Sequence, residues 1–186
     1  MPKVIDETKI FNAALNMLIS HGYEGATTQK IATVAGVNEV TLFRKYGSKA
    51  GLFEKVIEYQ LSDTPLNKLL YTGNLEADLL AIVEAYIKTN QTYGDIIPIL
   101  LIEMPRYPDL QRSFNTPWKN IQAIIKTVQR YQEQGLLKSE PPLASLSALI
   151  GPILVSQMLR HANLNLPVPD IDAKAHVDSF LHGRRL

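Results

Sequence analysis

Residues 27–49 read TTQKIATVAGVNEVTLFRKYGSK and predict two short helices joined by a tight turn. The first half places apolar residues on one helical face, and Gly36 follows where this helix must end, because glycine adopts positive φ at no steric cost. Asn38 can cap a second helix over residues 39–46, and Ser48 can cap a third. Two helices joined by a short turn containing glycine form a helix-turn-helix, whose second helix enters the major groove of DNA.

The second helix of this motif has an apolar and a polar face. We expect Val40, with Phe43 or Leu42, to hold it against the first helix. The polar and basic side chains then face outward and can contact base edges and phosphates. Short helical hairpins also occur in proteins that do not bind DNA, so a solvated charged face is the alternative. The predicted DNA-binding residues are Thr27, Thr28, Asn38, Glu39, Thr41, Arg44, Lys45, Tyr46 and Lys49.

The chemistry of these side chains suggests separate roles. Arg44 and Lys45 can reach guanine or phosphate, whereas Glu39 can only accept a hydrogen bond, for example from a cytosine amino group. Thr28 and Tyr46 can bond phosphates and fix the register. Lys49 lies at the start of the next helix, where backbone N–H groups also favour phosphate.

A longer series of residues resembles the N-terminal domain of the tetracycline-repressor (TetR) family. The resemblance implies a homodimeric, all-helical transcription regulator with a variable C-terminal ligand domain. Three positions depart from the family pattern: Asn38 replaces a common serine, Phe43 replaces a frequent tyrosine and loses its phenolic hydrogen bond to phosphate, and Ala50 replaces a frequent acid. The matching residues are Ile10, Ala13, Ala14, Leu18, Gly22, Tyr23, Thr27, Thr28, Ile31, Ala32, Ala35, Gly36, Val37, Thr41, Leu42, Phe43, Tyr46, Ser48, Lys49 and Leu52.

The bulk composition is that of an ordinary soluble globular protein. The chain has 186 residues, a net charge of +1 and no cysteine, which excludes disulfides, thiolate catalysis and cysteine-based zinc sites. Because the net charge is so small, any charge that binds DNA must be concentrated on one face. No signal peptide opens the chain and no apolar run approaches the ~20 residues of a membrane span, so we expect a cytoplasmic protein with no membrane partner.

Helical periodicity continues to the C-terminus, and we predict an all-α fold of about nine helices. Residues 1–48 are expected to form the DNA-binding head, and residues 49–186 a bundle for ligand binding and dimerisation. Pro65 should bend or restart the fourth helix. The sixth, at residues 95–104, is apolar all round and is therefore expected to be buried all round. The remaining helices are expected near residues 5–21, 49–71, 75–93, 108–114, 118–134, 143–163 and 170–181.

The second body contains aromatic residues and few polar groups, a combination typical of small-molecule pockets. Arg160 is one of these polar groups, and Gly151-Pro152 is expected to bend the eighth helix and widen the pocket. For each residue, an ordinary core or surface position is the alternative. The predicted pocket residues are Tyr86, Tyr93, Glu103, Met104, Tyr107, Trp118, Gln122, Gln157 and His161.

The last two helices are too apolar to be half-solvated, and the resemblance implies that they form a four-helix interface with their symmetry mates. A monomer that buries both helices internally is the alternative. A symmetric dimer with two heads requires a palindromic site with half-sites ~34–36 Å apart, or a multiple of that distance. The predicted interface residues are Leu146, Ile150, Leu154, Met158, Val177, Phe180 and Leu181.

The sequence contains none of the usual catalytic or metal-binding patterns. The histidines lack the spacing of metal ligands, no glycine-rich phosphate loop is present, and no serine lies in a nucleophile elbow. We therefore expect no enzyme, no metal and no cofactor. The leading hypothesis is a repressor that leaves palindromic double-stranded DNA when a small, mostly apolar effector binds. A helical protein-interaction module without DNA binding and a small all-α enzyme are the alternatives.

Overall fold

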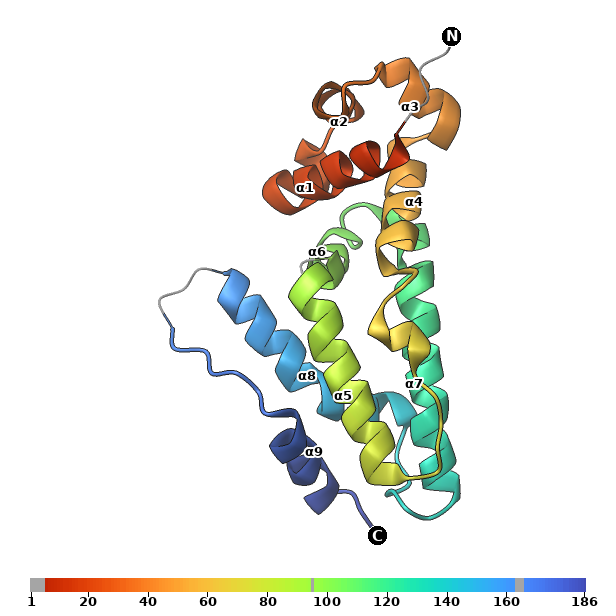
Figure 1. Ribbon diagram of the computed structural model, residues 1–186, viewed down its shortest axis with the longest axis vertical. Helices are drawn as coiled ribbons and strands as arrows, with labels where there is room; N and C mark the ends of the chain where they lie inside the picture. Colours follow the sequence, from red (N-terminus) through yellow and green to blue (C-terminus); the bar gives the residue numbers. More distant parts are fainter. Residues whose placement is uncertain (1–5, 95, 163–165) are drawn as a thin grey trace. The chain divides into compact units, whose positions relative to one another are not determined.

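The computed structural model describes residues 6–94, 96–162 and 166–186, apart from the side chain of His161. Within these ranges the chain forms nine α-helices and two short 3-10 helices, and no β-strand (Figure 1). The expected all-α class is therefore confirmed. The α-helices are α1 (Glu7–Gly25), α2 (Thr28–Ala35), α3 (Glu39–Tyr46), α4 (Lys49–Leu61), α5 (Leu75–Tyr93), α6 (Ile96–Glu103), α7 (Asn115–Glu133), α8 (Pro142–His161) and α9 (Ala173–His182), and the 3-10 helices are η1 (Pro65–Lys68) and η2 (Pro108–Phe114).

Glycine and proline account for the main interruptions. Gly22 has a φ of 67° and breaks the helical path near the end of α1, as predicted. The helix expected from residue 49 to about 71 ends at Leu61, and the chain restarts as η1 at Pro65, whose ring supplies no backbone N–H. Helix α7 begins at Asn115 rather than at Trp118, so Pro117 lies within its first turn.

The prediction that the sixth helix is buried on all sides is wrong. Ile96 and Leu100 of α6 are fully buried, but Leu101 and Ile102 are 43% and 53% exposed. Helix α6 packs against α1 and η2. These neighbours cover one side of the helix and leave its other side exposed.

The chain separates into two compact units. Unit 1 comprises Met1–Asp63 with Ile96–Pro117, so α4, α6 and η2 pack together with the three helices of the head. Its core includes Ile10, Leu18 and Leu42, and it also contains Leu110 from η2. The sequence-based boundary after residue 48 separates a DNA-binding part from a ligand-binding and dimerisation part, and this functional division stays a prediction. By packing, the head is a larger body that includes a segment from the middle of the chain.

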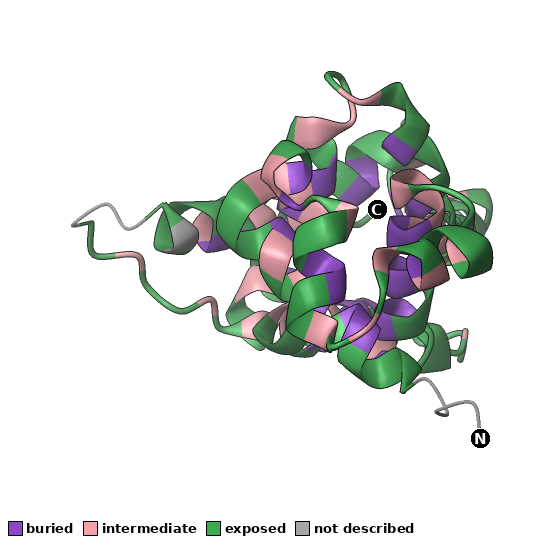
Figure 2. Cartoon of the chain, turned by 90° about the horizontal axis from the view of Figure 1, so that it is seen from above, coloured by how far each residue is buried: buried purple, intermediate pink, exposed green. Residues whose placement is uncertain are grey.

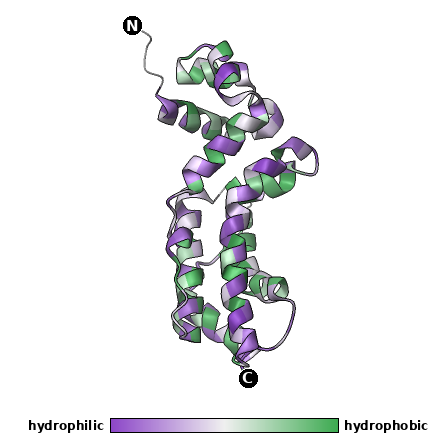
Figure 3. Cartoon of the chain, turned by 90° about the vertical axis from the view of Figure 1, so that its right-hand side faces the viewer, coloured by the Kyte–Doolittle hydropathy of each residue, from purple (hydrophilic) through white to green (hydrophobic). Residues whose placement is uncertain are grey.

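Unit 2 comprises Thr64–Asp95 with Trp118–Leu186. In both units, buried residues lie on inward helix faces and exposed ones on outward faces, with hydrophobic and hydrophilic positions mixed along most helices (Figures 2 and 3). A buried carboxylate, Asp78 of α5, organises one end of unit 2: it accepts hydrogen bonds from the Thr72 backbone (2.9 Å) and from the Tyr131 hydroxyl (2.5 Å). Burial acts to raise the pKa of Asp78, but these hydrogen bonds hold it below its ordinary value.

Among the long helices in the described part of unit 2, α8 is the most apolar. Residues 142–160 are long and apolar enough to cross a membrane by length and composition, yet only 22% of that window is buried within the chain. The expectation that no apolar run approaches this length is therefore wrong. Leu143 and Val155 are 52% and 54% exposed, so α8 presents an apolar face that unit 2 does not cover.

Candidate nucleic-acid interface

The ends of the helix-turn-helix are fixed by the local signals that the sequence contains. The Thr27 hydroxyl accepts a hydrogen bond from the Lys30 backbone (3.3 Å) at the start of α2, and the Asn38 side chain accepts one from Val40 (2.8 Å) at the start of α3. Gly36 ends α2 in the left-handed conformation, with a φ of 67°. Thr27 and Asn38 therefore act first as caps, which satisfy backbone N–H groups that the helix leaves unpaired.

Leu42 is the one side chain of α3 that is fully buried in the head. Leu42 is 1% exposed, whereas Val40 and Phe43 are 71% and 48% exposed. The expectation that Val40 faces inward is wrong, because the inner stripe is Leu42 and, one turn later, the half-buried Tyr46. Exposed apolar side chains on a recognition helix can contact the methyl group of thymine. Val40 is thus a candidate DNA contact that sequence reasoning missed, since an aliphatic residue in a short helix is assigned to the core by default.

Arg44 is the most available cation on α3. It is exposed and makes no ion pair with any residue in the described part of the chain. Thr41, another predicted DNA contact on α3, is half-buried and therefore less available than Arg44. A guanidinium with all its N–H groups free can form the bidentate pair with guanine that is the commonest specific contact in the major groove.

Lys45 and Tyr46 share an acidic partner on α1. The Lys45 ammonium lies 2.7 Å from Glu7 Oε1, and the Tyr46 hydroxyl donates a hydrogen bond to the same oxygen (3.2 Å). The hydrogen bond from Lys45 holds the pKa of Glu7 below its ordinary value, while burial and then Glu7 raise the pKa of Tyr46. Both predicted phosphate contacts must therefore leave Glu7, or share it, before they bind DNA.

Thr28 and Glu39 are also paired with each other. The Thr28 hydroxyl donates to Glu39 Oε1 at 2.6 Å, which joins the first residue of α2 to the first residue of α3. The structure thus brings these two predicted DNA-binding residues together across the turn. Glu39 retains a second oxygen that could accept a hydrogen bond from a base.

Lys49 is bound into unit 1 more tightly than the sequence indicates. Its ammonium lies 4.2 Å from the centre of the Tyr23 ring and donates to the Glu24 carbonyl oxygen (3.3 Å). Burial lowers the pKa of Lys49, although nearby carboxylates oppose this effect. Burial also raises the pKa of Tyr23 to about 12. A role for Lys49 in holding the start of α4 on α1 therefore stands beside its predicted contact with phosphate.

The structure does not gather the predicted pocket residues within one unit. Glu103, Met104 and Tyr107 belong to unit 1, where the Tyr107 hydroxyl donates to Glu24 Oε2 (2.8 Å). The others lie in unit 2, where Trp118 is 42% exposed. Tyr86 and Tyr93 are half-buried, Gln122 is exposed, and the side chain of His161 lies outside the described residues.

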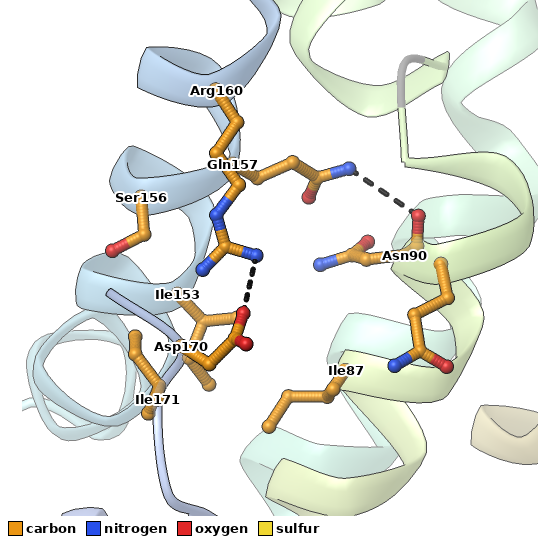
Figure 4. A pocket seen from close by; sticks show the side chains of 9 residues that line it. Ile87, Asn90, Ile153, Ser156, Gln157, Arg160, Asp170 and Ile171 are labelled. Carbon is orange, nitrogen blue, oxygen red and sulfur yellow. Dashed lines mark hydrogen bonds and ion pairs between the residues drawn. The ribbon is translucent and has the colours of Figure 1, made fainter. Parts of the chain in front are cut away.

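One cavity of about 400 Å³ opens in unit 2 between α5, α8 and the segment before α9 (Figure 4). Of the predicted pocket set, Gln157 lines it, and Arg160 lies beside Gln157. Asn90, Ile87 and Ile153 were not anticipated, because their spacing on α5 and α8 gives no sign that these two faces meet. Helix α8 is continuous through Pro152, so the expected widening at this proline finds no support.

Some of the predicted dimer-interface residues are buried within the chain, and others remain exposed. Leu146, Val177, Phe180 and Leu181 are buried in the core of unit 2 and pack within the chain. Met158 is 39% exposed. Of the predicted residues, Met158 and the half-buried Ile150 and Leu154 are the ones that a second copy could still contact on α8. Val155, which is 54% exposed, was not predicted.

Comparison with known proteins agrees with this geometry. Residues 10–56 match the family model described as bacterial regulatory proteins, tetR family. An HTH-type transcriptional regulator of Bacillus subtilis, YvkB, is 28% identical over 132 residues, which are 70% of each chain. A nucleoid occlusion factor, SlmA of Idiomarina loihiensis, is 26% identical over 179 residues, which are 91% of each chain.

Solved structures show the same fold over nearly the whole chain. A TetR-family transcriptional regulator from Thermus thermophilus, PfmR, superimposes with a TM-score of 0.66 at 19% identity and covers 93% of this chain and 97% of its own. The match therefore includes the second unit, where the sequence motif does not extend.

Proposed function

We propose that this chain is a regulator of the TetR family, and specifically a cytoplasmic repressor that binds a palindromic operator as a homodimer and leaves it when a small effector binds. The family and the fold are those of DNA-binding regulators rather than of enzymes. The observation that supports sequence-specific binding best is the outer face of α3, where Arg44 is exposed and unpaired in the described chain and Val40 projects beside it.

Selection from a random pool of DNA duplexes tests the operator. We expect the enriched sequences to contain inverted half-sites, and binding to weaken steeply with salt as phosphates release their counterions. Arg44→Ala should weaken binding to the selected duplex by about 1–3 kcal/mol and affect unrelated duplexes less. Lys126→Ala, which removes an exposed cation from α7 in unit 2, is the matched control. Equal losses for both variants would remove Arg44 from the base-reading residues.

The homodimer rests on the apolar face of α8. A helix with this composition and this little intramolecular cover requires a partner, and isologous pairing is the commonest solution for soluble chains. A membrane is the other apolar surface that could cover it. The proposed membership in a family of DNA-binding regulators favours a second copy.

Sedimentation at micromolar concentration distinguishes these possibilities. The chain should sediment as a dimer, and Val155→Asp combined with Met158→Asp should give monomers that bind the selected duplex far more weakly. Leu70→Asp, at an 81% exposed leucine outside α8, should leave the dimer intact. A monomeric wild-type chain, or one that floats with lipid vesicles, would contradict the proposal.

Release by an effector requires that the effector prefer the conformation that cannot bind the operator. The cavity of unit 2 supports this part of the proposal, because its volume of about 400 Å³ is sufficient for a small molecule. A protein-interaction module without DNA binding is the second candidate; it would show no salt-dependent binding to any duplex, so the same titration separates the two.

A further inference from the structure

The Thr28–Glu39 hydrogen bond joins the two helices of the helix-turn-helix. The Thr28 hydroxyl, on the first residue of α2, donates to Glu39 Oε1, on the first residue of α3, at 2.6 Å. This length is typical of a bond between a hydroxyl and an ionised carboxylate. A glutamate side chain has many rotamers, so an anchor on a second helix lowers the entropy that Glu39 would lose on binding a ligand.

The same hydrogen bond limits what Thr28 can do. A hydroxyl carries a single hydrogen, and the oxygens of a DNA phosphate can only accept. While Thr28 donates to Glu39, it therefore cannot donate to the phosphate that the sequence suggests as its partner. The geometry favours a different role for Thr28, in which it holds Glu39.

The negative charge of Glu39 is uncompensated within the described ranges of the chain. Glu39 is half-buried, and its carboxylate forms no ion pair there, whereas Lys45 of the same helix is paired with Glu7. A carboxylate on a surface that approaches DNA is repelled by phosphates at every sequence, unless a base donates a hydrogen bond to it. Glu39 can therefore contribute to the specificity of binding rather than to its overall strength.

One base matches the free oxygen of Glu39. Its Oε2 accepts no hydrogen bond from the described residues, so it is available to a donor. In the major groove, guanine exposes two acceptors, thymine exposes a carbonyl oxygen, and adenine places its N7 acceptor beside its amino group. Each of these acceptors repels a carboxylate. Cytosine exposes only its amino group, which is a donor.

We propose that Thr28 is a positioning residue, which holds the Glu39 carboxylate so that it selects a cytosine in each half-site and excludes the other bases there. This inference rests on the proposed function, for which it names one base of the operator. The alternative is a structural role, because an acidic residue in the first turn also stabilises α3. A structural role would change the melting temperature and leave the base preferences as they are.

Selection from random duplexes, repeated with variants of the full-length protein, tests the reading of cytosine. The wild type should favour cytosine at one position of each half-site by about tenfold over the other bases. Glu39→Ala should lose this preference at that position alone and should bind unrelated duplexes as tightly as the wild type or more tightly. Glu39→Gln should shift the preference towards adenine, because an amide donates and accepts as adenine requires.

Two substitutions of Thr28 test the positioning. Thr28→Val removes the hydroxyl but keeps the shape of the side chain, and it should reduce the cytosine preference severalfold. Thr28→Ser keeps the hydroxyl and should retain the preference. Thr33→Val is the matched control: it removes a hydroxyl from the same helix that donates to the Gln29 carbonyl oxygen (2.9 Å) instead of to Glu39. Thermal melting of each variant separates a loss of folding from a loss of specificity.

The guanine paired with the selected cytosine is tested separately. Replacing it by 7-deazaguanine removes an acceptor and leaves the cytosine amino group, so the effect of Glu39→Ala should persist. Loss of that effect would show that the guanine is read, and would overturn the inference.

Two other results would also overturn the inference. One is an unchanged set of base preferences in Glu39→Ala. The other is a Thr28→Val protein that binds every duplex more weakly but keeps its cytosine preference, because this would identify Thr28 as a phosphate contact. If the wild type selects a specific duplex and either result is found, only the roles of Thr28 and Glu39 are wrong. If it binds no duplex at all, the proposed function is wrong as well.

Discussion

Replacing Glu7 by glutamine is expected to strengthen DNA binding. The Glu7 carboxylate lies 2.7 Å from the Lys45 ammonium and therefore occupies a cation that the recognition helix would otherwise offer to phosphate. In the wild-type protein, Lys45 must leave Glu7 before it contacts DNA. The amide of Glu7→Gln is uncharged, so it removes this competition and keeps the size of the side chain.

The structure limits the size of the effect. The side chains of Lys45 and Glu7 are 40% and 48% exposed, and ion pairs this open to solvent contribute at most about 1 kcal/mol. The variant should therefore bind up to about fivefold more tightly per protomer, or about 25-fold for a dimer. The salt dependence should change too. Salt weakens the Lys45–Glu7 pair and so lowers the cost of breaking it, which partly offsets the loss of DNA affinity as salt rises. The slope of log K against log salt should therefore become steeper once Glu7 is neutral.

Fluorescence anisotropy with labelled duplexes at several salt concentrations measures both quantities. The gain should be the same for the selected operator and for unrelated DNA, because phosphate contacts carry no sequence information. Glu58→Gln is the matched control: it removes the same charge from an exposed pair of the same length, 2.7 Å to Lys55, but on α4. Unchanged affinity and slope in Glu7→Gln would show that Lys45 does not reach phosphate. Weaker binding would show that Glu7 positions Lys45 rather than competing for it.

Four further variants probe stability. Hydrogen bonds hold the pKa of Asp78 in the folded protein below its ordinary value of 3.8, so its carboxylate stabilises the fold above that pH, and this effect is lost as the pH falls through the lower folded-state pKa. Asp78→Asn should therefore flatten the decline in urea stability in the acid range below about pH 5, and an unchanged decline would exclude this role. Tyr131→Phe should lower the free energy of unfolding, measured in urea, by about 1.5–3 kcal/mol, because it removes a hydrogen bond to the buried Asp78 carboxylate. An unchanged free energy of unfolding would mean that water replaces the hydroxyl. Gly51→Ala should lower stability by about 1–3 kcal/mol, because its Cβ would meet the carbonyl oxygen of Tyr46, and an unchanged melting temperature would contradict this close approach. Gln157→Leu should raise the unfolding free energy by about 1 kcal/mol by removing an unpaired buried acceptor, and a clear loss in calorimetry would refute that account.

The position of α6 and η2 shows where sequence patterns stop being informative. The two helices expected at residues 95–104 and 108–114 are present as α6 and η2, but their place in a ligand domain was inferred from chain order alone. The structure packs them in unit 1, with Leu110 in the core of the head. Tyr107 consequently bonds Glu24, 83 residues earlier in the chain, and does not belong to unit 2. No periodicity along the chain encodes such a pairing.

The sequence alone determined the helix-turn-helix. Its caps at Thr27 and Asn38 and its turn at Gly36 act within four residues, and hydrogen bonds of that range depend only on neighbouring residue types. Tertiary structure alone decided which side chains remain free to act. Lys45 is held by Glu7, whereas Arg44 next to it is open, and Gln157 meets Asn90 across two helices. These outcomes depend on which helix faces come together, and that choice follows from the burial of the whole core rather than from any local pattern.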